Sequence, residues 1–95
     1  MNKVKVGILP TIHLFENDNP YDDKYTFVNS YCAQISNGGG IPVGILLNNN
    51  ELDEASLEMC DAFIIGGGNK IEPCFLELIN YATVNNIPLL GICLG

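Results

Sequence analysis

The final five residues of the sequence give its clearest indication of chemistry. In Gly91-Ile92-Cys93-Leu94-Gly95, a cysteine stands between apolar residues, with a glycine two positions away on each side. A small–x–nucleophile–x–small pattern directly after a buried strand is typical of a nucleophile elbow, where glycines let the backbone fold tightly around a strained turn. The pattern makes Cys93 a candidate nucleophile. An ordinary buried cysteine at a strand end is the alternative interpretation.

A glycine triplet, Gly66 to Gly68, follows a second apolar run in AFIIGGGNKIEP. Bare backbone N–H groups in such a loop can stabilise a developing negative charge. The same triplet could instead be a flexible turn, or the phosphate loop of a flavodoxin-like nucleotide-binding domain. The phosphate interpretation is disfavoured because no G-x-G-x-x-G motif is present and no lysine–serine pair follows the glycines.

The elements that would position these features follow from hydrophobic patterning. Four runs are apolar at consecutive positions, which indicates strands covered on both faces, as in a parallel sheet; they are residues 4–10, 42–47, 62–67 and 88–93. Helical apolar spacing lies between the runs, over 28–35, 53–59 and 75–82. Glycines 38–40 are expected to end the first helix, and Pro73 suits the first turn of the third.

The order β-α-β-α-β-α-β predicts an α/β fold: an open, doubly wound parallel sheet of the flavodoxin-like, three-layer α/β/α type, with four strands present. Ninety-five residues allow one domain, 1–95. In such sheets, chemistry gathers at the carboxyl ends of the strands. The loop after the first strand, residues 11–23, the glycine triplet and Cys93 should all lie at that edge.

Composition narrows the possible partners. The formal net charge of −7 and the absence of a basic stripe exclude nucleic acid. No apolar run approaches the ~20 residues needed to cross a bilayer, and no signal peptide is recognised, so we expect no membrane partner and a cytoplasmic location. Four dispersed cysteines and a single histidine predict no metal site, no disulfide framework and no cofactor.

Three segments together resemble the amino-terminal half of a class I glutamine amidotransferase-like domain. Within that superfamily, the sequence is most similar to the γ-glutamyl hydrolase group, the peptidase C26 type that includes γ-glutamyl-γ-aminobutyrate hydrolases. The resemblance covers nearly the whole chain. It rests on YCAQISNGGGIPVGIL, on DAFIIGGGNKIEP and on the elbow PLLGICLG.

The resemblance implies a role for each matching residue. Cys93 would attack the γ-carbonyl of a small-molecule γ-glutamyl substrate to give a γ-glutamyl thioester, which water then cleaves. The backbone N–H groups of Leu94, Gly66 and possibly Gly67 would form the oxyanion hole. Ile65 stands where the family often has proline, and Asn69 where an acid is common; both differences bear on loop shape or substrate preference.

One family feature is missing from the 95 residues. These enzymes activate the cysteine with a histidine oriented by a carboxylate, and no His-x-Glu pattern occurs here. His13 follows the first strand, but a lone loop histidine is more often solvated than catalytic. The neighbouring acids Glu16, Asp18, Asp22 and Asp23 are predicted to form a solvated loop. We therefore expect a chain truncated after the elbow and inactive by itself.

The fourth predicted strand bears on a second class of function. IPLLGICLG carries no charge, and a strand of this kind at a sheet edge favours pairing with another chain. Self-association through this edge is therefore expected. A non-catalytic binding or assembly module, completed by a partner along the fourth strand, is the alternative to an enzyme.

Overall fold

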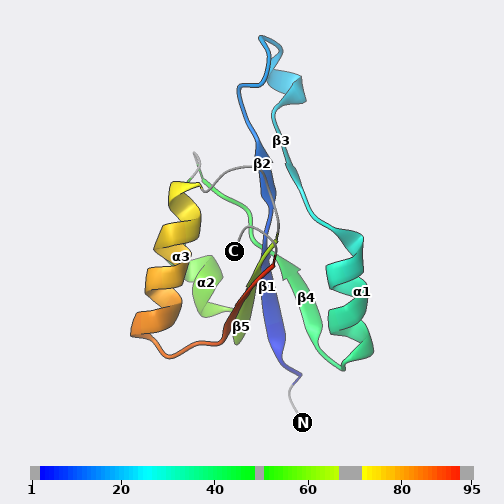
Figure 1. Ribbon diagram of the computed structural model, residues 1–95, viewed down its shortest axis with the longest axis vertical. Helices are drawn as coiled ribbons and strands as arrows, with labels where there is room; N and C mark the ends of the chain where they lie inside the picture. Colours follow the sequence, from blue (N-terminus) through cyan, green and yellow to red (C-terminus); the bar gives the residue numbers. More distant parts are fainter. Residues whose placement is uncertain (1–2, 49–50, 67–71, 93–95) are drawn as a thin grey trace.

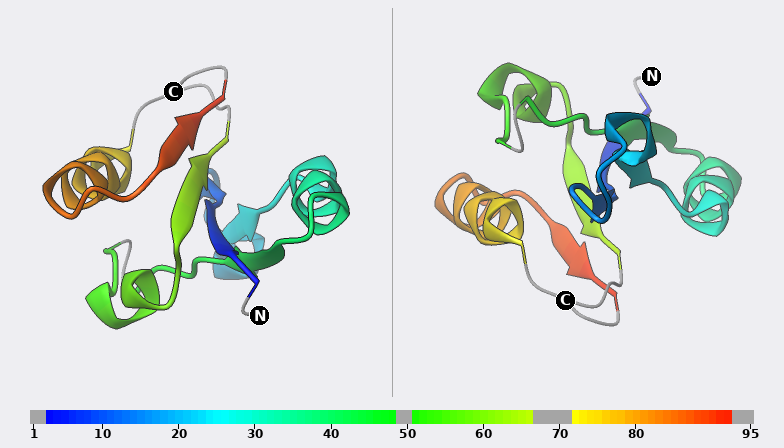
Figure 2. Two further views of the ribbon diagram at one scale, coloured as in Figure 1. Left: turned by 90° about the horizontal axis from the view of Figure 1, so that it is seen from below. Right: turned by 90° about the horizontal axis from the view of Figure 1, so that it is seen from above.

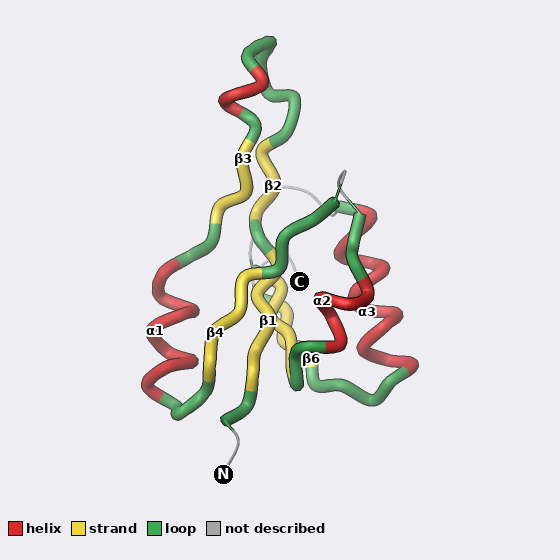
Figure 3. The backbone as a smooth tube through the Cα atoms, turned by 180° about the vertical axis from the view of Figure 1, so that it is seen from behind, coloured by secondary structure: helices red, strands yellow, loops and turns green. Residues whose placement is uncertain are grey.

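The computed structural model describes residues 3–48, 51–66 and 72–92. Its centre is a four-stranded parallel sheet with strand order β4-β1-β5-β6 (Figures 1 and 3). The strands are β1 (Lys5–Leu9), β4 (Ile41–Gly44), β5 (Ala62–Ile65) and β6 (Leu89–Gly91). The four predicted strands and their parallel arrangement are confirmed, although each is shorter than its apolar run. Among the described residues, β4 and β6 form the two edges of the sheet.

Helices cover both faces of this sheet. They are α1 (Asn29–Asn37), α2 (Glu54–Glu58) and α3 (Pro73–Val84). Viewed along the strands, α1 lies on one face while α2 and α3 lie on the other (Figure 2). This arrangement follows from right-handed crossovers, because β1 to β4 moves one way along the sheet and the later crossovers move the other way. The flavodoxin-like α/β fold is thus confirmed. No described helix is long and apolar enough to cross a membrane.

The helix boundaries have local causes that the sequence displays. Pro73 occupies the first turn of α3, where the missing N–H costs no hydrogen bond. Asp53 caps α2, with a carboxylate oxygen accepting a hydrogen bond from the N–H of Ala55 at 3.1 Å. Two acids, Asp53 and Glu54, therefore lie where the helix dipole favours negative charge.

The glycines after α1 end the helix in a Schellman motif. The N–H of Gly40 donates to the carbonyl of Ile35 at 2.9 Å, and the N–H of Gly39 donates to that of Ser36 at 3.1 Å. Gly39 has a φ of +88°, in the left-handed region that glycine enters without a steric cost. The predicted glycine stop is confirmed, and it sets the direction in which the chain enters β4.

A cluster of buried apolar residues lies on the face covered by α2 and α3. Phe63 of β5 and Leu78 of α3 are at its centre, 1% and 0% exposed. Its other members are Leu9, Ile45, Leu57, Cys60, Ile65, Cys74 and Phe75. In contrast, no residue of α1 is fully buried. The sheet is therefore anchored firmly on one face and covered more thinly on the other.

A two-stranded antiparallel ribbon interrupts the segment that the sequence analysis treated as a loop. Its strands are β2 (Thr11–His13) and β3 (Lys24–Thr26), and a short 3-10 helix spans Pro20–Asp22 between them. The ribbon extends beyond the carboxyl end of β1 (Figure 1). The prediction of a plain loop over 11–23 is therefore wrong. Strands of three residues are too short to leave a readable period in the sequence.

The geometry after α1 predicts opposite effects for two neighbouring glycines. Gly39→Ala should lower the free energy of unfolding by about 1 kcal/mol, because a side chain is strained at positive φ even though no atom lies within 4 Å of the added carbon. Gly38→Ala is the matched control, since its φ is −81° and the added carbon meets only ordinary contacts. It should be neutral or slightly stabilising. Chemical denaturation measures both; equal losses would contradict the assignment of the helix end.

Candidate functional site

The carboxyl edge of the sheet brings the ends of β5 and β6 together. Ile65 pairs in register with Gly91, and the N–H of Ile92 donates to the carbonyl of Ile65 at 2.9 Å. The pairing therefore continues to the last described residue before Cys93. On the neighbouring strand, Gly66 follows Ile65 directly. Two of the segments singled out in the sequence, the glycine triplet and the elbow, thus begin at adjacent strand ends on one edge.

The predicted site residues fall only partly within the described chain. Gly66 is described and half-buried. Gly67, Cys93 and Leu94 lie outside the described residues, and so does Asn69, whereas Ile65, the other departure from the family pattern, is buried at the end of β5. The described part of the site is accordingly its framework, formed by the ends of two parallel strands.

Tyr31 of α1 is a contact of this framework that the sequence analysis did not single out. A carbon added at Gly66 would lie 2.9 Å from Cε2 of the Tyr31 ring, closer than real side chains approach. Gly66 thus allows an aromatic ring of the α1 layer to pack directly against the end of β5. The signal in the sequence was ambiguous, because Tyr31 forms part of an apolar helical stripe and its partner is a glycine.

Two of the three other cysteines, Cys60 and Cys74, are poor candidates for a nucleophile. Cys74 of α3 is 2% exposed, and burial raises the pKa of its thiol to about 11, with Glu72 adding to the effect. Burial also raises the pKa of Cys60, again helped by a neighbouring carboxylate, Asp61. Because the thiolate is the reactive form, both thiols are suppressed at neutral pH. Cys32 lies on α1 and is half-buried.

His13 belongs to the ribbon and is already engaged there. It stands in β2, and its Nδ1 lies 3.1 Å from a carboxylate oxygen of Glu16. The acids of the ribbon tip are not merely solvated. Asp23 accepts a hydrogen bond from the N–H of Phe15 at 2.9 Å, and Asp22 accepts one from the side chain of Asn17 at 2.8 Å. These contacts shape the ribbon tip, which extends past the carboxyl edge of the sheet, the edge at which β5 and β6 end (Figure 1).

Metal binding finds no support in the part of the chain that the structure describes. No three His, Cys, Asp or Glu side chains converge there in a way that could hold an ion.

Comparison with known proteins gives two related results. CTP synthase of Borreliella burgdorferi is 34% identical to this chain over 77 residues, which are 78% of this chain and 14% of that protein. CTP synthase of Borreliella afzelii matches with the same identity and coverage. The chain therefore spans about 14% of the length of these curated relatives. No solved structure matches it.

The sequence model of the family described as Peptidase C26 matches residues 5–77. The matched range begins with β1 and ends within α3, so it includes the glycine triplet and Tyr31 but precedes β6. This range is more than half of the chain, and the fold within it is the one that the resemblance implied. The chain therefore belongs to the peptidase C26 family, within the class I glutamine amidotransferase-like superfamily.

Proposed function

We propose that this chain carries the nucleophile half of a cysteine-dependent hydrolase or amidotransferase site for γ-glutamyl amides. Cys93 Sγ, as thiolate, forms a bond to the γ-carbonyl carbon, and the C–N bond breaks as the protonated amine or ammonia leaves. Water then attacks the γ-glutamyl thioester, releasing glutamate and regenerating the thiol. Family membership supports a hydrolase of the glutamine amidotransferase type, and the γ-glutamyl substrate is our extension of it.

The observation that carries this proposal is the register between β5 and β6. Backbone groups of alternate strand residues point to opposite neighbours. On β5, the N–H of Phe63 donates to the carbonyl of Pro88, and the carbonyl of Ile65 accepts from Ile92, so odd-numbered positions face β6. Gly66 follows Ile65 directly at this strand end, and we propose the N–H groups of Gly66 or Gly67 and of Leu94 as the oxyanion donors.

A base is the component that the proposal requires from elsewhere. His13 is the one histidine of the sequence, and it is engaged with Glu16 on the ribbon. We propose that residues 1–95 are the amino-terminal half of a glutamine amidotransferase-like domain and do not turn over substrate alone. Exposed apolar side chains support this incompleteness: Leu76, Ile79 and Leu90 are 59%, 42% and 57% exposed.

The same exposure favours an assembly role as a second candidate. In the described sheet, β6 pairs with β5 alone, and its Leu90 is exposed. An apolar edge strand of this kind can pair with a second copy of the chain. An assembly module of this type would need no reactive thiol, whereas the enzyme proposal requires one at position 93.

Thiol reactivity tests the enzyme proposal. A chloroketone analogue of glutamine, applied near pH 8, should alkylate Cys93 at least about tenfold faster than Cys60 or Cys74, whose raised pKa values keep them protonated. Peptide mapping by mass spectrometry identifies the labelled residue. Cys93→Ser should remove the fast phase, and Cys32→Ser, the matched control, should leave it unchanged. Labelling that settles on Cys32 would overturn the site assignment.

The contact between Gly66 and Tyr31 makes a second, independent prediction. Gly66→Ala should lower the free energy of unfolding by about 1–3 kcal/mol, because the added carbon overpacks against the tyrosine ring. In the background of Tyr31→Leu the same change should cost at least about 0.5 kcal/mol less, since a smaller side chain can yield. Denaturation of the four proteins measures this coupling. Strictly additive losses would show that the ring does not pack against Gly66.

A further inference from the structure

A groove between α2 and α3, whose lining includes no residue from the ends of β5 and β6, is not explained by the proposed reaction. Its volume is about 290 Å³. The apolar part is formed by Leu57, which is 3% exposed, by Leu52 and by the ring of Tyr81. That ring is held in an edge-to-face contact with Phe63 of the core, with centroids 6.2 Å apart. The groove therefore has an apolar floor with a fixed aromatic wall.

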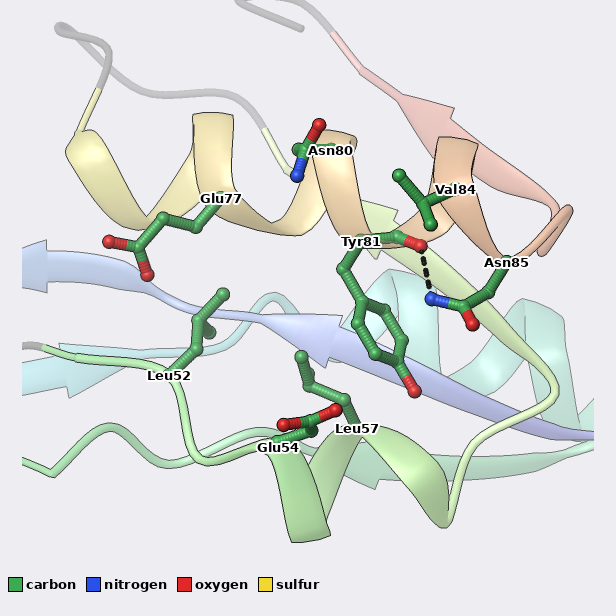
Figure 4. A pocket seen from close by; sticks show the side chains of 8 residues that line it. All are labelled: Leu52, Glu54, Leu57, Glu77, Asn80, Tyr81, Val84 and Asn85. Atoms are coloured by element: carbon green, nitrogen blue, oxygen red, sulfur yellow. Dashed lines mark hydrogen bonds between the residues drawn. The ribbon is translucent and has the colours of Figure 1, made fainter.

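The polar groups around this floor include donors and acceptors, and the charged ones are two carboxylates. Glu54 of α2 and Glu77 of α3 approach the groove near Leu52 from its two sides (Figure 4). At the other end, the side-chain N–H of Asn85 donates to the backbone carbonyl of Tyr81 at 2.9 Å. One of its two amide N–H donors is thereby engaged, while its oxygen stays available as an acceptor. A ligand that matches this lining must supply several donors and an apolar stem.

The two described segments that contain the groove residues contribute only negative charge. Described segments 51–66 and 72–92 contain no lysine or arginine. Their charged residues are all acidic: Glu51, Asp53, Glu54, Glu58, Asp61, Glu72 and Glu77. The ion pair between His13 and Glu16 lies on the ribbon and not here. A cation from another molecule would complement the two carboxylates that line the groove, Glu54 and Glu77.

We propose that the groove between α2 and α3 docks an arginine side chain carried by an apolar segment of a partner protein. The guanidinium offers five donors in a plane, which suits acceptors placed on both sides of the groove, and it stacks on tyrosine more favourably than a lysine ammonium does. The methylene stem would cover Leu57, and apolar flanking residues would cover Val84, which is 70% exposed. This site is independent of the reaction proposed for Cys93.

A peptide titration tests the proposal on the whole chain. The probe is the blocked tripeptide acetyl-Leu-Arg-Leu-amide, added to ¹⁵N-labelled protein while amide shifts are followed by NMR. Saturable shifts are expected at Leu57, Tyr81 and Asn85, with affinity that falls as salt increases. The same peptide with citrulline, which keeps the shape but not the charge, should bind at least about fivefold more weakly. Arginine amide, lacking the apolar flanks, should bind more weakly than the peptide.

Charge-matched variants distinguish binding in the groove from general electrostatic attraction of the peptide to an acidic protein. The double variant Glu54→Gln/Glu77→Gln should weaken the arginine peptide about tenfold, as expected from losing two exposed charge pairs. Glu51→Gln/Glu58→Gln removes the same charge outside the groove and should have little effect. The proposal is overturned by equal weakening in both variants, by absence of saturable shifts, or by equal binding of the citrulline peptide. Equal binding of arginine amide would show that a small cation, and not a protein segment, is the ligand.

Discussion

Parallel pairing between β5 and β6 is the constraint on which the candidate site depends. Both strands run in one direction and are held in register as far as Ile65 and Gly91, so they end side by side at one edge of the sheet. The residues that follow, a glycine triplet on one strand and a cysteine elbow on the other, are thereby required to start next to each other. No side-chain contact is needed for this juxtaposition. It is a consequence of backbone hydrogen bonds and of right-handed crossovers.

Packing on the two faces of the sheet supports this edge in different ways. On the face covered by α2 and α3, Phe63 and Leu78 belong to the buried cluster that fixes β5 in place. On the α1 face, Tyr31 packs against the position where Gly66 has no side chain. The end of β5 is thus held from both sides. The family match over residues 5–77 includes β5 and α1 but ends before β6. The place where the elbow begins therefore follows from the pairing of β6 with β5.

Continuous apolar runs and helix stop signals made most of the fold predictable from sequence, because both arise from local chemistry. Glycines 38–40 and Pro73 mark helix ends that the structure reproduces. The ribbon of β2 and β3 was missed, since three-residue strands have no legible period. At the site, the strand ends were predictable from topology. The contact between Tyr31 and Gly66 was not, because a glycine does not indicate which neighbour fills the space beside it.

The central claim is that Cys93 faces amides at the end of β5. The most direct test is the set of nuclear Overhauser effects from the β protons of Cys93 in the labelled chain. The account predicts contacts to the amide protons of Gly66 or Gly67, together with solvent exposure of the thiol. Contacts from Cys93 to Phe75 or Leu78 would instead bury the sulfur in the core and would contradict the assignment of a nucleophile.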